Sequence, residues 1–392
     1  MERRRQGDKE TRGQGDKETG RKISCLLVSL SPLLLVFLSL SVRLPTSAQR
    51  LEWGAQSSGA LAKLSGVFFV DRDHGWVVGS NGALLATEDG GAKWRRQELP
   101  ERQRNEALND VWFFNPDRGL LLGEYGLFNR KGDIDWSERV FLLMSKDRGA
   151  NWEARTPARL QIRQSGQPDR LSGGNQNGDM LKTGRRPPDP ILLRMSFAND
   201  HVGWAVGESG VIQRTIDGGA TWALQDAPTR KLLYDVAAID DSHAWAVGAG
   251  GIVLRTVDGG RNWDEQSSGV IQTLRAVHFV DAKRGWAVGT KGTILSTING
   301  GARWQRQTSG VDLNLNDVVF LNAKEGQREG QREGWIAGDR GLLLHTTDGG
   351  ATWENVELSA RANLSRLFFI APDCGWVVGT SGAIFKYGRT SK

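Results

Sequence analysis

Acidic residues recur at one fixed place in this sequence, five residues before a tryptophan. Carboxylates in such numbers could ligate Ca²⁺ or transfer protons in catalysis. Each copy belongs to a separate repeat of about 41 residues, however, and a carboxylate can instead accept backbone N–H groups within its own turn, above a buried tryptophan. We therefore predict that these residues build the fold: Asp89, Asp147, Asp217, Asp258, Asn299 and Asp348, followed by Trp94, Trp152, Trp222, Trp263, Trp304 and Trp353.

Basic side chains supply a second kind of chemistry, because a guanidinium can hold a carboxylate through two parallel hydrogen bonds. Arg194 and Arg366 occupy a strand position where other repeats have Gly, Ala or Asp. Arg214 and Arg255 share one register in neighbouring strands, and Arg230 and Lys231 lie between two repeats. We predict that these six residues bind a partner. Alternatively, such arginines only neutralise nearby aspartates, as Arg194 would with Asp235.

The repeat defines the elements that must position these side chains. In the unit ending at Trp304, residues 274–279, 285–289 and 292–297 have the pattern of short strands, and a fourth strand follows the tryptophan. Glycines that flank two residues, at Gly289 and Gly292, fit a tight hairpin. Four antiparallel strands in each unit are typical of a β-propeller blade.

Counting the units predicts a closed ring. The last unit, around Trp376, stops before its acidic turn, whereas residues 51–59 resemble a fourth strand without the preceding three. Placing Trp53 in the blade of Trp376 closes the ring and leaves no free sheet edge. We predict an all-β, seven-bladed propeller of four-stranded antiparallel blades over residues 49–388, with insertions at about 155–190 and 324–333 and a tail at 389–392. Propeller centres are common ligand and partner sites.

The first 48 residues predict export. Residues 1–22 form a polar, low-complexity leader that we expect to be disordered. Residues 23–48 contain a leucine-rich run that ends in small residues, which predicts a signal peptide cleaved after Ala48 or an uncleaved membrane anchor. The only cysteines, Cys25 and Cys374, exclude an intramolecular disulfide in the cleaved form. We expect an exported monomer, associated with membranes peripherally or through that anchor.

Charge and ligand chemistry narrow the function further. The formal net charge is +6, but residues 1–48 carry nine Lys/Arg against five Asp/Glu, which leaves 42 against 40 for the remainder. A nearly neutral body argues against nucleic acid as a partner. Five scattered histidines and one mature cysteine predict no metal site and no cofactor. Sorted by the usual propeller path, one face is acidic and the other mildly basic, which favours an anionic partner.

The turn motif resembles the Asp box, the repeat of bacterial neuraminidases. Its coupling to a preceding Gly-Trp strand throughout residues 51–388 resembles the photosystem II assembly and stability factor family of cyanobacteria and chloroplasts. That resemblance implies a seven-bladed propeller exported to the thylakoid lumen, or to the periplasm in related bacterial proteins. It also implies a non-enzymatic assembly factor that binds the precursor of a reaction-centre core subunit through an arginine-rich patch. The two insertions depart from the minimal propeller.

Two alternative functions stay open. A sialidase-like or other glycoside hydrolase needs an arginine triad and a tyrosine nucleophile paired with glutamate, yet Arg-Ile-Pro is absent, and the only tyrosines are Tyr125, Tyr234 and Tyr387. A generic exported scaffold in a non-photosynthetic bacterium would share the repeat pattern. Whether the source genome encodes photosystem II reaction-centre subunits separates that alternative from an assembly factor.

Overall fold

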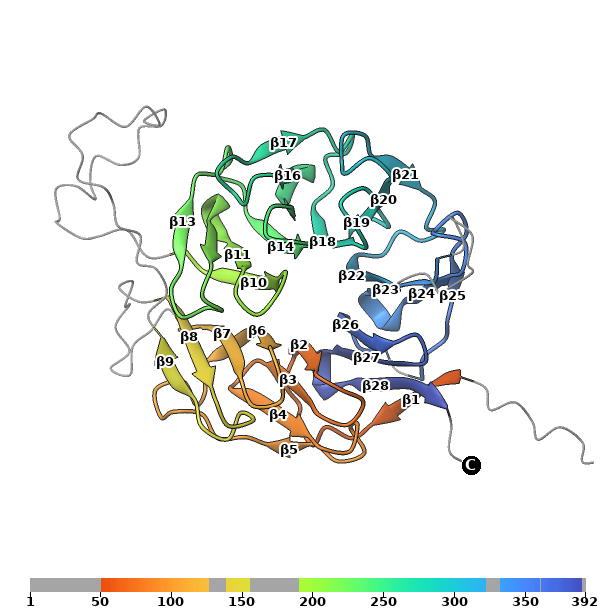
Figure 1. The fold of residues 1–392 in the computed structure, drawn as a ribbon. Helices are drawn as coiled ribbons and strands as arrows, with labels where there is room; N and C mark the ends of the chain where they lie inside the picture. Colours follow the sequence, from red (N-terminus) through yellow and green to blue (C-terminus); the bar gives the residue numbers. More distant parts are fainter. Residues whose placement is uncertain (1–50, 127–138, 156–189, 322–331, 360, 390–392) are drawn as a thin grey trace, which may run out of the picture. The chain divides into compact units, whose positions relative to one another are not determined.

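A computed structural model describes residues 51–126, 139–155, 190–321, 332–359 and 361–389 of the chain. These residues form seven four-stranded antiparallel sheets arranged as the blades of a propeller (Figure 1). The predicted all-β, seven-bladed fold is therefore confirmed. The predicted leader, the signal segment with its cleavage after Ala48, and almost all of both insertions and the tail lie outside the described residues.

The blades are numbered in chain order, and each contains four strands. Blade 1 contains β2 (Leu64–Phe69), β3 (Gly75–Gly79), β4 (Ala83–Thr87) and β5 (Arg95–Arg96). Blade 2 contains β6 (Ala107–Phe113), β7 (Gly119–Glu124), β8 (Val140–Ser145) and β9 (Glu153–Arg155). Blade 3 contains β10 (Leu192–Phe197), β11 (Gly203–Gly207), β12 (Ile212–Thr215) and β13 (Ala223–Gln225).

The second half of the ring repeats this order. Blade 4 contains β14 (Leu233–Ala238), β15 (Ala244–Gly248), β16 (Val253–Thr256) and β17 (Asp264–Gln266). Blade 5 contains β18 (Leu274–Phe279), β19 (Gly285–Gly289), β20 (Ile294–Thr297) and β21 (Gln305–Gln307). Blade 6 contains β22 (Leu315–Phe320), β23 (Gly334–Gly338), β24 (Leu343–Thr346) and β25 (Glu354–Asn355). Blade 7 contains β26 (Leu364–Ala371), β27 (Cys374–Gly379), β28 (Ile384–Arg389) and β1 (Leu51–Gln56).

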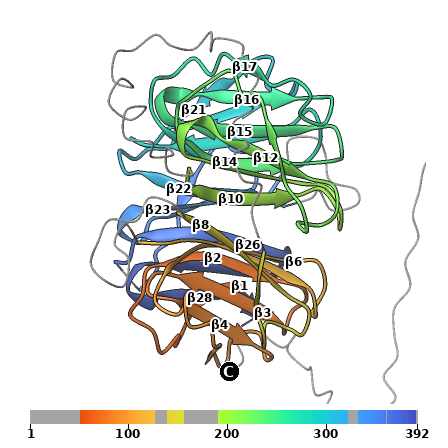
Figure 2. The same cartoon turned by 90° about the vertical axis from the view of Figure 1, so that its left-hand side faces the viewer.

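The first strand of each blade lies nearest the centre of the ring. These strands, β2, β6, β10, β14, β18, β22 and β26, contact one another in that order, and β26 returns to β2 (Figure 1). The second strand is buried at every residue in six of the blades, as in the "GWAVG" of β19. Figure 2 shows the same ring from its side.

Tight turns join the second and third strands, as the paired glycines predict. Lys291 and Gly292 both adopt positive φ angles, 55° and 60°. A Cβ at Gly292 would lie 1.9 Å from the Val311 carbonyl oxygen, so only glycine fits there. In four blades the turn is a single 3₁₀ turn: η1 (Glu208–Gly210), η2 (Ala249–Gly251), η3 (Asp339–Gly341) and η4 (Thr380–Gly382). Within the described part of the chain, no helix combines the length and the apolar character needed to cross a membrane.

Strand β1 closes the ring as predicted. It pairs antiparallel with β28, and Trp53 stands opposite Tyr387 in that ladder. The Trp53 ring also meets Trp335 of blade 6 edge to face, at 5.4 Å between centroids. The start of the propeller therefore completes its last blade and supports the neighbouring blade.

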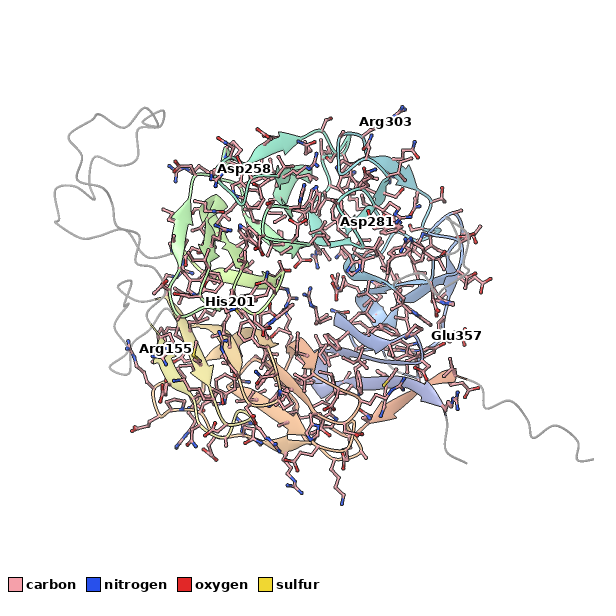
Figure 3. The ribbon with its side chains drawn as sticks, in the orientation of Figure 1. Arg155, His201, Asp258, Asp281, Arg303 and Glu357 are labelled. Carbon is pink, nitrogen blue, oxygen red and sulfur yellow. The ribbon has the colours of Figure 1, made fainter. Side chains whose placement is uncertain are left out.

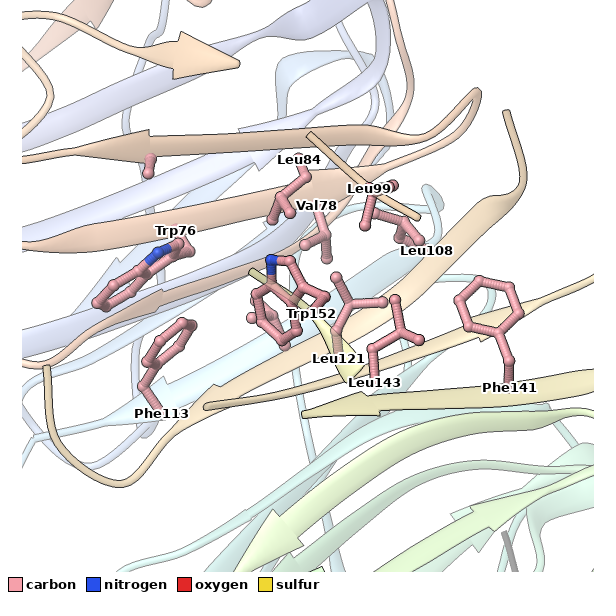
Figure 4. Close-up of a cluster of buried hydrophobic side chains, with 12 residues drawn as sticks. Trp76, Val78, Leu84, Leu99, Leu108, Phe113, Leu121, Phe141, Leu143 and Trp152 are labelled. Carbon is pink, nitrogen blue, oxygen red and sulfur yellow. The ribbon is translucent and has the colours of Figure 1, made fainter. Parts of the chain in front are cut away.

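The blades adhere through a repeated aromatic stack. Trp76 in the second strand of blade 1 stacks on Phe113 of blade 2 at 3.4 Å, and Trp152 meets the same Phe113 edge-on at 6.0 Å (Figure 4). Blade pairs 4/5, 5/6 and 7/1 repeat the face-to-face stack at 3.4 to 3.7 Å. Because each tryptophan lies between neighbouring sheets, the core is a ring of interfaces between blades.

Candidate functional site

Each Asp-box side chain is held within its own turn. In blade 4, Asp258 Oδ1 accepts hydrogen bonds from Thr256 Oγ1 at 2.9 Å and from the Asn262 backbone N–H at 3.0 Å. Asn299 accepts the equivalent pair in blade 5, from Thr297 Oγ1 and the Arg303 N–H. The backbone and side-chain hydrogen bonds from Asn262 lower the pKa of Asp258 to about 2.

This geometry supports a structural role for the Asp boxes. Thr352 and Thr346 donate hydrogen bonds to Asp348 and, against the opposing effect of burial, lower its pKa to about 2 as well. Among the described residues, no group of three or more His, Cys, Asp or Glu side chains could hold a metal ion. The tryptophans of the motif are buried in blades 2 to 5, and Trp94 and Trp353 are partly buried.

Arg214 and Arg255 lie on the side of the ring that carries the Asp boxes. The Arg214 guanidinium lies over the Trp204 ring, 5.3 Å from its centroid, and its Nη2 donates to the Asp241 carbonyl oxygen of blade 4 at 3.2 Å. Arg255 lies over Trp245 in the same way, at 5.6 Å. Each arginine covers the tryptophan of its own blade, and Arg214 also bonds to the next blade.

Arg230 and Lys231 lie at the opposite end of the blade. Both are exposed in the connection from β13 to β14, close to the turn η2. Because β13 runs antiparallel to β12, the connection after β13 cannot share a face with the Asp-box turn after β12. The six basic residues predicted to bind a partner therefore divide into an Asp-box pair, a pair on the opposite face, and a central pair.

The central channel opens on that opposite face into a cavity of about 500 Å³. Every first strand contains a β-bulge just after its initial leucine, and the extra residue at each bulge lines the cavity. One residue per blade forms this bulge ring: Ser65, Asn109, Leu193, Tyr234, Arg275, Asn316 and Ser365. We call the space the mouth cavity.

Polar groups of the bulge ring are tied to neighbouring blades. Ser65 Oγ, Asn109 Nδ2 and Asn316 Nδ2 each donate to the carbonyl oxygen of the initial leucine in the next blade, at 2.5, 3.0 and 2.8 Å. Arg275 Nη1 donates to Asn316 Oδ1 at 2.7 Å. Within the residues that the structure describes, its buried Nε finds no hydrogen-bond acceptor.

A charged layer lies directly beneath, at the residue after each bulge. Its ionisable members are Asp110, Arg194, Asp235, Asp317 and Arg366. Each aspartate accepts a backbone N–H from the following blade through Oδ2, at 2.7 to 2.9 Å. These carboxylates fasten neighbouring blades together around the channel.

Both arginines of this layer lie beside aspartates, but Arg194 has a different partner from the one suggested by the sequence. Arg194 lies 3.6 Å from Asp110 and donates to the carbonyl oxygens of Ser65 and Asn109, so the pairing with Asp235 was wrong. Arg366 donates to Asp317 at 3.2 Å and approaches Asp235 across the channel at 3.6 Å. Blades 2 and 4 both adjoin the blade of Arg194, and its guanidinium lies on the side of blade 2, where the carbonyl oxygens of Ser65 and Asn109 accept its hydrogen bonds.

Burial shifts the ionisation of this layer. Burial raises the pKa of Asp235 to about 6, against the attraction of the Arg366 and Arg194 guanidiniums. Burial opposes the charge of Arg366, but the carboxylates of Asp317 and Asp235 outweigh it and raise its pKa. For Arg194, burial and the repulsion of Arg366 lower the pKa. Asp235 is thus a buried channel carboxylate whose pKa lies close to neutral pH.

Sequence reasoning found the arginines of the charged layer and missed the bulge ring above them. Arg275 was placed inside a strand, with no reason to face the channel. The signal was present in the spacing, because Leu274 and Val277 are buried three positions apart and break strict alternation. An extra residue between two buried positions indicates a bulge.

The fold and its turns define a seven-bladed propeller of the Asp-box class. The sequence model of the family described as photosynthesis system II assembly factor YCF48 matches residues 46–184, 180–263 and 266–362. The chain belongs to this family. The photosystem II assembly lipoprotein Ycf48 of Synechococcus sp. (strain CC9902) is 26% identical over 184 residues, which are 46% of this chain and 42% of that relative. The match thus spans less than half of the relative's length.

Solved structures share the fold at low sequence identity. A structure described as YCF48 bound to D1 peptide superposes with a TM-score of 0.63 at 21% identity and covers 88% of this chain and 100% of its own. A GH74 xyloglucanase from Xanthomonas campestris gives a TM-score of 0.59 at 13% identity and covers 85% and 53%. Since propellers of both kinds superpose, the fold alone does not separate assembly factors from hydrolases.

Proposed function

We propose that this protein is a non-enzymatic, monomeric assembly factor that binds the precursor of a photosystem II membrane subunit. Membership of the assembly-factor family supports the class of function, and a structural relative carries a D1 peptide. The binding surface that we propose is the face with the mouth cavity, which we call the mouth face. It carries Arg194 in the cavity wall, Arg366 beneath it, and Arg230 and Lys231 in a neighbouring loop.

The mouth cavity is the observation that carries this proposal. All seven blades contribute at least one residue to its lining, so a bound segment could contact the whole ring. Its lining mixes amides, hydroxyls, Tyr234 and cations, groups suited to the backbone and polar side chains of a peptide. Asp-box residues, by contrast, are already engaged in their own turns.

We also propose an exported location, the thylakoid lumen or the periplasm, with contact to the membrane. The relative from Synechococcus is called a lipoprotein, and the apolar segment at residues 23–48 of this chain fits export. The source genome should then encode photosystem II reaction-centre subunits. A genome without them would leave a generic exported scaffold.

Capture of the precursor from detergent-solubilised membranes tests the function. The wild-type protein should retain the precursor of a reaction-centre subunit, and the double variant Arg230→Glu/Lys231→Glu should retain several-fold less. Arg303→Glu is the matched control, since Arg303 lies at the outer rim of the ring (Figure 3). Failure of the wild-type protein to capture any precursor would refute the proposed function.

A second charge-reversal pair decides which face binds. Arg214→Glu/Arg255→Glu alters the Asp-box side and leaves the mouth face intact. We expect little loss of capture from this pair after correction for stability. Loss greater than that of Arg230→Glu/Lys231→Glu would move the binding surface to the Asp-box side.

A further inference from the structure

The mouth cavity contains a cation with unused hydrogen-bonding capacity. Arg275 donates Nη1 to the neutral amide oxygen of Asn316, and its buried Nε meets no acceptor in the described part of the chain. Arg275 lines the cavity, and a guanidinium forms stronger hydrogen bonds with a carboxylate than with a neutral amide oxygen. Asp339 also lines the cavity, but its two oxygens already accept hydrogen bonds from Asn314 and Asn316.

The charges of this region are balanced before any ligand arrives. The cavity lining and the charged layer together hold four cations, Lys63, Arg194, Arg275 and Arg366, and four carboxylates, Asp110, Asp235, Asp317 and Asp339. Glu124, which accepts a hydrogen bond from Asn109, lies just outside this set. An arriving anion would therefore add an uncompensated negative charge in a region of low dielectric.

Asp235 is the group that can relieve this imbalance. Its Oδ1 accepts no hydrogen bond from any described residue and lies 3.6 Å from Arg366. Its Oδ2 accepts the Val277 N–H of β18, two residues beyond Arg275 on the same strand. The cavity cation and the carboxylate beneath it are thus joined through one short stretch of strand.

The charged groups that face Asp235 come from several blades. Arg366 of β26 and Arg194 of β10 attract its ionised form, and Asp317 of β22 repels it. His278 of β18 stays neutral near pH 6, since burial lowers its pKa to about 4. Burial is the largest effect on Asp235 and raises its pKa to about 6.

We propose that the mouth cavity binds a carboxylate group through Arg275 and that Asp235 takes up a proton when the carboxylate binds. The ligand is a carboxylate of an acidic peptide segment, at a side chain or at a free terminus. The added negative charge favours the protonated form of Asp235, so linkage requires binding to tighten as the pH falls toward 6. This inference rests on the proposed function and adds the chemistry of the bound segment and its control by pH.

Titration calorimetry on the full-length protein tests the proposal. The probe is a synthetic, N-acetylated hexapeptide with two aspartates, in free-acid and amidated forms. Its carboxylates, with pKa values of about 4, stay ionised between pH 5.5 and 7.5. We expect binding about sixfold tighter at pH 5.5 than at pH 7.5, which corresponds to a rise of about one unit in the pKa of Asp235 from its value of about 6 in the free protein. Buffers of different ionisation enthalpy should report proton uptake near pH 6.5.

Two variants separate the roles of the residues. Arg275→Gln should weaken binding about tenfold at both pH values, the loss of one charge-assisted hydrogen bond. Asp235→Asn should bind at pH 7.5 as tightly as the wild-type protein does at pH 5.5, with no pH dependence. If Asp235→Asn does not fold, the proton uptake of the wild-type protein carries this part of the test.

The outcomes also separate this inference from the proposed function. Selective binding of the free-acid peptide identifies a terminal carboxylate, and equal binding of both forms identifies a side chain. Binding without proton uptake, or unaffected by Arg275→Gln, overturns the inference. Capture of the precursor by a protein that binds neither peptide would overturn the inference alone, whereas absence of precursor capture refutes the proposed function.

Discussion

The aspartates of this propeller fall into two groups with different hydrogen-bond donors, and amino-acid composition does not distinguish the two groups. The aspartates of the Asp boxes accept hydrogen bonds within one turn, and the aspartates of the channel accept a backbone N–H from the next blade. Their pKa shifts have different causes: hydrogen bonds from Asn262 lower the pKa of Asp258 to about 2, whereas burial raises that of Asp235 to about 6.

Asn299 provides a natural comparison for the Asp-box role. Asp89 and Asn299 each accept the same two hydrogen bonds, from a threonine hydroxyl and from the N–H four residues on. Asp89→Asn should therefore cost little stability, whereas Asp89→Ala should cost about 1 kcal/mol because the turn N–H groups lose their acceptor. Urea unfolding measures both, and equal losses would contradict this role.

At the level of elements, strand β1 holds the ring closed. It supplies the fourth strand of blade 7 and places Trp53 between Tyr387 of its own blade and Trp335 of blade 6. Without it, β28 would present a free edge and the apolar surface around Trp335 would be uncovered. Strand β1 thus joins blade 7 to the N-terminal side of blade 1.

Deletion of residues 49–58 should therefore lower the melting temperature of the whole propeller in one transition. Trp53→Ala should have a smaller effect, a loss of about 3 kcal/mol in the free energy of unfolding, because the backbone ladder remains. Differential scanning calorimetry can compare both with the substitution Glu52→Ala in the same strand. A deletion variant that melts like the parent would contradict closure by β1.

Across the whole molecule, the channel connects distant parts of the ring. Arg366 of blade 7 donates to Asp317 of blade 6 and approaches Asp235 of blade 4 across the centre. The family match covers most of the repeats, while the hydrolases that share the fold show that such a ring suits several functions.

Replacing Arg366 tests how much its contacts with Asp317 and Asp235 contribute to the stability of the protein. Arg366→Met should destabilise the protein by about 3 kcal/mol, because it leaves two buried carboxylates without their cation. The double variant Arg366→Met/Asp235→Asn should recover part of that loss, since one of the two charges is gone. A double-mutant cycle compares the wild-type protein, Arg366→Met, Asp235→Asn and the double variant. Equilibrium urea unfolding of these four proteins gives the coupling free energy between the two residues. Strictly additive losses would show that the two residues do not interact.

The sequence by itself determined the repeat, the four strands of each blade, the seven-blade count and the closure by Trp53. These follow from local patterns, because turn glycines, alternating apolar residues and the period of about 41 residues leave little choice of fold. It also placed Arg194 and Arg366 at one register of the inner strands.

Only the tertiary structure decided what those inner residues contact. Seven β-bulges place one residue per blade at the mouth cavity. A bulge depends on the packing of both faces of the sheet, so the local sequence pattern indicates it only weakly. The closed ring then brings Arg366 of blade 7 toward Asp235 of blade 4 and places Arg194 beside Asp110 of blade 2. Contacts between residues far apart in the chain arise when the ring closes, so the place of Arg275 in the cavity and the ion pairs of the charged layer emerged only from the folded protein.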